Sequence, residues 1–87
     1  MAKLITAAER ITRARKMIQE ARDIPVPEGL FGKSDLSYVA GVKDLLRQAR
    51  ELVRLIPMRA GISDEMKTDA NQILQETDQV EEELLRS

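Results

Sequence analysis

The chain has 87 residues, 43% of them hydrophobic and 33% charged, a balance typical of one small globular domain rather than of a disordered segment. It lacks cysteine and histidine, which excludes disulfides, thiolate chemistry, the commonest metal ligand and the usual general base. The net charge of −1 is unevenly spread, because residues 1–60 hold twelve basic against seven acidic residues and residues 61–87 hold two against eight. With one Phe and one Tyr, the core is expected to be aliphatic.

The first predicted helix covers residues 3–22. Large aliphatic residues alternate along it with alanines at spacings of three and four: Leu4, Ala7, Ile11, Ala14, Ile18 and Ala21. This spacing predicts a narrow apolar seam whose alanines let a second helix approach closely. Pro25 and Pro27 then end the helix, because proline cannot continue the hydrogen-bond ladder and restricts the residue before it.

The connection over residues 23–33 is long and apolar. Its hydrophobic residues are Ile24, Val26, Leu30 and Phe31. A flexible linker would be polar, so we expect an ordered loop folded over one end of the helices. Two interpretations remain open: the loop, with Phe31 as its anchor, is a lid on the core, which we favour, or it is an exposed partner surface rimmed by Glu28 and Lys33.

The second predicted helix covers residues 35–56 and ends before Pro57. Ser34 or Asp35 is expected to cap its N-terminus. Its apolar seam comprises Val39, Val42, Leu46, Ala49, Val53 and Ile56. Gly41 interrupts the pattern, and we interpret it as the mark of a close helix contact.

The third predicted helix covers residues 63–86, with Ser63 as its N-cap and acidic residues in its first turn. Its seam comprises Met66, Ala70, Ile73, Thr77, Val80 and Leu84. Three amphipathic helices need one another to bury their seams, and the connections favour antiparallel neighbours. The sequence therefore predicts an all-α fold, an antiparallel up-down-up three-helix bundle forming a single domain over residues 1–87.

Charged residues flank the predicted seams. A basic stripe follows the second helix at spacings of four, three and four: Lys43, Arg47, Arg50 and Arg54. An acidic stripe follows the third helix: Glu65, Asp69, Glu76 and Glu83. In a hairpin centred near residue 60 the stripes face each other, so we expect interhelical ion pairs; the alternative is a free basic stripe that binds phosphates. Arg15 lies within the first helix's apolar arc, either at its edge or paired with Glu76 or Glu81.

No sequence motif points to catalysis. Glycine-rich phosphate loops and nucleophile elbows are absent, and Glu81, Glu82 and Glu83 point about 100° apart on a helix, so they cannot bind one metal ion. We expect no catalytic residue, cofactor or metal site. The start of the chain does not resemble a signal peptide and no apolar stretch approaches a membrane span, so we expect a cytoplasmic protein with no membrane contact.

These observations favour a small, non-enzymatic protein-interaction or assembly module whose partner is another protein or a second copy of itself, as in a homodimer. The candidate partner surface comprises Leu30, Phe31, Leu74 and Leu85. One alternative is a nucleic-acid-binding domain that uses the basic stripe, with Arg10, Arg13 and Lys16 in support; the acidic third helix and the lack of aromatic residues disfavour it. Another is a regulatory subunit whose apolar loop docks on an enzyme.

Overall fold

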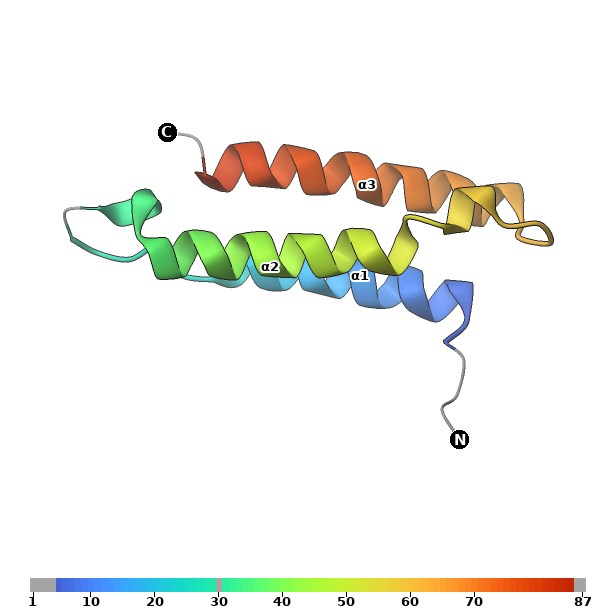
Figure 1. Cartoon of the computed structure of the whole chain (residues 1–87), viewed down its shortest axis with the longest axis horizontal. Helices are drawn as coiled ribbons and strands as arrows, with labels where there is room; N and C mark the ends of the chain where they lie inside the picture. The colour runs from blue at the N-terminus through green and yellow to red at the C-terminus, as the bar shows by residue number, and fades with distance from the viewer. Residues whose placement is uncertain (1–4, 30, 86–87) are drawn as a thin grey trace.

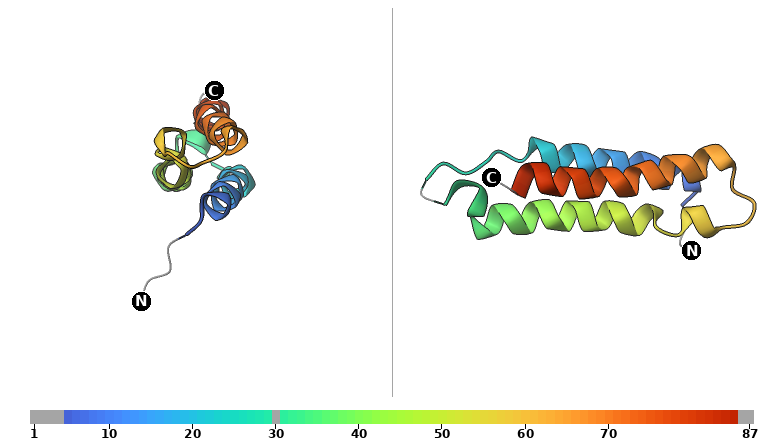
Figure 2. Two further views of the ribbon diagram at one scale, coloured as in Figure 1. Left: turned by 90° about the vertical axis from the view of Figure 1, so that its right-hand side faces the viewer. Right: turned by 90° about the horizontal axis from the view of Figure 1, so that it is seen from above.

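Three helices lie side by side and alternate in direction along the chain (Figure 1). The computed structural model describes residues 5–29 and 31–85. The helices are α1 (Ala7–Asp23), α2 (Leu36–Val53) and α3 (Asp64–Leu85), and short 3₁₀ helices occur at η1 (Gly32–Ser34) and η2 (Ile56–Met58). Seen along the bundle, the three helices occupy the corners of a triangle, and each packs against the other two (Figure 2). The predicted all-α three-helix bundle is confirmed.

Polar side chains cap the start of each long helix. Thr6 accepts a hydrogen bond from the backbone N–H of Glu9 at 3.1 Å, so α1 begins at Ala7, later than the predicted Lys3. Asp35, rather than Ser34, caps α2 by accepting from the N–H of Tyr38 at 3.0 Å. Ser63 does the same for α3, where it accepts from the N–H of Met66 at 3.2 Å.

The second helix ends at Val53, three residues before the predicted boundary. Pro57 supplies no N–H for an α-helical bond and disfavours helical geometry at Ile56. The chain tightens there into η2, in which the N–H of Met58 donates to the carbonyl of Leu55 at 3.1 Å. Because η2 continues in the direction of α2 (Figure 1), the chain reverses only in the following turn.

The core is a single cluster of buried aliphatic residues from the three helices and η2, with one tyrosine. Its members are Ile11, Ala14, Ile18, Ala21, Tyr38, Val42, Leu46, Ala49, Val53, Ile56, Ala70, Ile73 and Val80. Two buried residues of the described chain, Thr77 and Tyr38, carry hydroxyl groups. The seam ends are half-buried: Ala7, Val39, Met66 and Leu84; Leu4 lies outside the described residues. At the start of α2 the core takes Tyr38 instead of the predicted Val39.

The core predicts a sharp contrast between two leucines of the same helix. Leu46 is fully buried, whereas Leu36 is 85% exposed. We expect Leu46→Ala to lower the free energy of unfolding by about 2–5 kcal/mol, because it leaves a cavity between three helices. The matched control, Leu36→Ala, should change it by less than about 0.5 kcal/mol. Urea titration followed by circular dichroism measures both values, and equal losses at the two sites would refute this assignment of the core.

Gly41 does not mark a close approach of two helices, contrary to the interpretation from sequence. A Cβ atom added at Gly41 would meet only the Cδ1 atom of Ile24, at an ordinary contact distance of 3.6 Å. The residue lies inside α2 with ordinary helical geometry. Its cost is therefore entropic, since glycine loses more backbone freedom on helix formation than alanine does.

We therefore expect Gly41→Ala to stabilise the protein by about 0.5–1 kcal/mol. The urea midpoint should rise while the slope of the transition stays unchanged. Gly61→Ala is the contrasting control, because Gly61 has a φ of +81°, where alanine is strained, and it should destabilise. A loss of stability on Gly41→Ala would show that the contact with Ile24 has no room for a methyl group.

Candidate protein-interaction site

Phe31 is exposed at the end of the bundle where α1 connects to α2. The residue is 73% exposed, so the interpretation of Phe31 as a lid on the core is wrong. The loop instead contributes Ile24, which is half-buried and packs against the core. Ile24 directly follows α1 and covers the end of the core. Phe31 lies farther along the loop and does not belong to the hydrophobic cluster.

Short-range backbone hydrogen bonds connect Phe31 and Gly32 to the start of α2. The N–H of Ser34 donates to the carbonyl of Phe31 at 2.7 Å, and the N–H of Asp35 donates to the carbonyl of Gly32 at 3.1 Å. Gly29 and Gly32 have positive φ angles of 127° and 45°, which residues with side chains rarely adopt. These bonds and turns hold the ring of Phe31 next to the N-terminus of α2.

Phe31 and Leu36 border an open hollow of about 400 Å³. Leu36, the first residue of α2, is 85% exposed. The rest of the lining is polar and comprises Ser34, Asp35 and Ser37. We call this group of five residues the loop-end surface. It combines two apolar side chains with one carboxylate and two hydroxyl groups.

The loop-end surface only partly matches the partner surface expected from sequence. Phe31 belongs to it, whereas Leu74 and Leu85 are half-buried and pack against the core at other places. Leu30 lies outside the described residues. Leu36 was missed, although its helical-wheel position is about 120° from that of Val42 and so points away from the seam.

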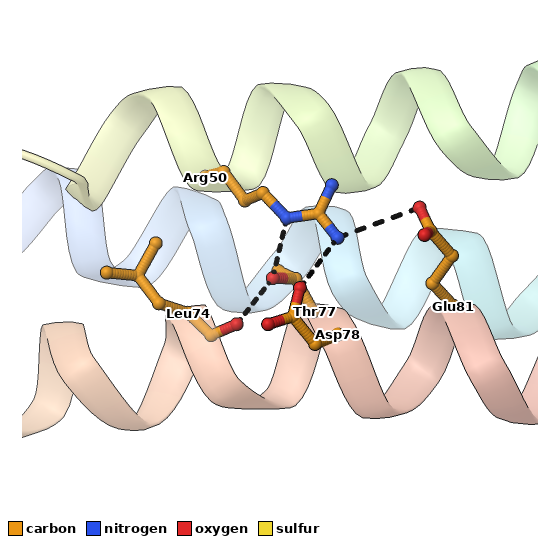
Figure 3. A network of polar contacts seen from close by, with 5 residues as sticks. All are labelled: Arg50, Leu74, Thr77, Asp78 and Glu81. Carbon is orange, nitrogen blue, oxygen red and sulfur yellow. Dashed lines mark hydrogen bonds and ion pairs between the residues drawn. The ribbon is translucent and has the colours of Figure 1, made fainter.

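A network of polar contacts joins α2 to α3 at the centre of the bundle (Figure 3). The Nε atom of Arg50 donates to the hydroxyl of Thr77 at 3.0 Å, and the Thr77 hydroxyl donates to the carbonyl of Leu74 at 2.7 Å. One terminal nitrogen of Arg50 lies 3.1 Å from a carboxylate oxygen of Asp78 and 3.6 Å from one of Glu81. The fully buried hydroxyl is therefore satisfied as donor and as acceptor.

The remaining basic stripe does not pair with α3 as predicted. Arg47 binds Asp44 and Arg54 binds Glu51 at 2.9 Å, both within α2, and the structure shows no ion pair for Lys43 with the described residues. Hydrogen bonds from Arg47 and then Gln48 lower the pKa of Asp44 below its usual value, which keeps this carboxylate ionised beside Arg47. Arg50 alone reaches α3, and neither of its acidic partners belongs to the predicted stripe.

Two acids of that stripe pair with α1 instead. Asp69 lies 3.6 Å from Arg15, and Glu83 lies 2.9 Å from Arg22. Arg15 is exposed at the edge of the apolar arc, the first of the two interpretations from sequence, and it does not pair with Glu76 or Glu81, the partners in the alternative. The basic stripe of α2 misses the acidic stripe of α3 because of the register of the α2–α3 hairpin: the Arg50–Asp78 pair places the midpoint of this hairpin at residue 64, not near 60.

Of the basic residues of α1, Arg10 lies next to the stripe, where it lines the same hollow as Arg47. Arg10 turns towards α2, where its Nη1 atom donates to the carbonyl of Leu52 at 3.4 Å, near the C-terminal end of that helix. Arg13 and Lys16 are exposed. On α2, Arg47, Arg50 and Arg54 each lie beside a carboxylate, whereas the structure shows no ion pair for Arg13, Lys16 or Lys43 with the described residues.

Within residues 5–29 and 31–85, no group of three or more acidic residues is arranged to hold a metal ion. No helix in this part of the chain has the length and apolar character needed to cross a membrane. No family model matches the chain, and comparison with curated proteins and with solved structures found no match.

The network around Thr77 predicts unequal roles for two arginines of α2. Arg50→Ala should lower the free energy of unfolding by about 1–2 kcal/mol, because it removes charge-assisted bonds between helices and a partner of a buried hydroxyl. Arg54→Ala removes only an exposed pair within one helix and should cost at most about 0.5 kcal/mol. Urea denaturation in low and high salt checks this, and indistinguishable losses would contradict a structural role for the network.

Proposed function

We propose that this chain is a small, non-enzymatic protein-interaction or assembly module that binds its partner through the loop-end surface. The observation that carries the proposal is the pair Phe31 and Leu36, both largely exposed beside a hollow. Aromatic side chains set in such hollows are the usual anchors of protein interfaces. The cysteine-free composition fits a reducing compartment, and we place the module in the cytoplasm.

Order in the loop supports this proposal. A binding residue on a disordered segment loses conformational entropy on association, whereas the turn around Gly32 and the capped start of α2 already hold Phe31 and Leu36 in place. The loop-end surface is therefore preorganised, and little binding energy is spent on ordering it. The nucleic-acid alternative has less support, because three of the four residues of the basic stripe lie beside carboxylates.

Because Phe31 is exposed, its replacement should affect binding of a partner and not the stability of the fold. We expect Phe31→Ala to change the free energy of unfolding by less than about 1 kcal/mol, since the ring contributes little to the core. A loss of about 3 kcal/mol or more would instead restore the role of a lid.

Binding is tested by a photo-crosslinking amino acid placed at position 31, with Gln72 on the exposed side of α3 as the control position. In cells that naturally make the chain, we expect a discrete adduct from position 31, none from position 72, and loss of the adduct when Leu36→Asp is added. Equal labelling from both positions, or an adduct indifferent to Leu36→Asp, would refute the loop-end surface as the binding site.

A further inference from the structure

The exposed large hydrophobic residues of this protein lie at the two opposite ends of the bundle. The connection from α1 to α2 and the connection from α2 to α3 lie at opposite ends of the bundle (Figure 1). Val26, Phe31 and Leu36 lie in or directly after the first connection, and Leu55 and Met58 lie in the second. Met58 is 77% exposed. The ends lie far apart, since the molecule extends 50 Å along its longest axis. One copy thus carries two separate apolar surfaces that cannot cover each other.

The two connecting segments also differ in charge. Residues 54–63, around Met58, contain two arginines and no acidic residue, and the acids Asp64 and Glu65 follow in the first turn of α3. Arg59 is exposed and forms no ion pair with the described residues, whereas Arg54 is held by Glu51. Residues 23–35 at the other end contain three acids and one lysine. Asp35 lines the hollow there and uses its Oδ1 atom to cap α2, which leaves the second carboxylate oxygen available to accept a hydrogen bond.

We propose that copies of this chain associate end to end, with Met58 of one copy seated between Phe31 and Leu36 of the next and Arg59 beside Asp35. This proposal rests on the proposed function and names its partner as a second copy of the chain. A thioether packs well against an aromatic ring, and a flexible methionine adapts to an irregular hollow. The arginine and the carboxylate have opposite charges, so their attraction favours this orientation over the contact of two like ends.

The symmetry of this contact has a consequence for assembly. The two surfaces are different, so a joined pair of copies still offers one free hollow at one end and one free Met58 at the other. Association therefore continues into short open chains or closes into a ring, instead of stopping at a dimer. Each contact surface consists of only a few side chains, whereas a stable interface buries roughly 800 Å² per partner, so we expect the assembly to be weak and concentration-dependent.

Sedimentation velocity of the purified chain over a wide concentration range tests this proposal. For the unmodified chain we expect the mean mass to rise with concentration. Met58→Asp and Phe31→Asp should each remain monomeric, because each variant retains only one of the two contact surfaces. Met58→Asp retains the hollow, and Phe31→Asp retains Met58. Gln72→Asp, on the exposed side of α3, should assemble like the unmodified chain. Thermal melts establish that all the variants fold.

Mixing the two monomeric variants is the decisive step. The hollow of Met58→Asp should accept Met58 of Phe31→Asp, so an equimolar mixture should form a 1:1 dimer and nothing larger. A mixture that remains monomeric would overturn the proposal. A Met58→Asp variant that still assembles would also overturn it, since the contact would then join two loop ends.

A chain that is monomeric at every concentration would overturn end-to-end association. The proposed function would still be supported if the crosslink from position 31 joined the chain to a different polypeptide. The absence of any crosslink from position 31, in contrast, would refute both end-to-end association and the proposed function. The two failures are therefore distinguishable.

Discussion

Narrow apolar seams are the constraint on which this fold depends. Each helix buries only a single row of side chains, and alanines fill several of the fully buried positions: Ala14, Ala21, Ala49 and Ala70. Small residues bring the helix backbones close together, but a seam this narrow removes too little apolar surface from water to stabilise one pair of helices. The third helix closes the triangle, so each seam is covered from two sides and no helix is expected to be stable without the others.

A polar contact supplies what the seams lack, which is a fixed register. Aliphatic side chains tolerate small axial shifts of one helix along another, whereas the hydroxyl of Thr77 must meet the Nε atom of Arg50 within hydrogen-bond distance. Shifting α3 by one turn would bury this hydroxyl without its arginine, at a cost of about 1–3 kcal/mol. The ion pairs of Arg15 and Arg22 with α3 are more exposed and add less.

The three-helix fold follows from sequence because periodicity, proline positions and capping residues are local signals. Each predicted seam is buried along its middle, from Ile11 to Ala21 on α1 for example. The charge partners could not be derived in the same way, because they depend on where the chain reverses. The midpoint of the α2–α3 hairpin lies at residue 64 instead of near 60, and Arg50 therefore meets two acids that periodicity had not paired with it.

The position of Phe31 shows a second limit of local reasoning. An apolar loop residue can cover the core only when no other residue occupies the same position. Here Ile24, which directly follows α1, packs against the end of the cluster. Competition between two loop residues for one site depends on three-dimensional distance, which hydrophobicity alone does not contain. The outcome separates two tasks in this chain: the seams and Thr77 stabilise the bundle, while exposed side chains at its ends are free to change with little effect on folding. Substitutions in a binding surface of this kind can change which partner it binds without destabilising the core.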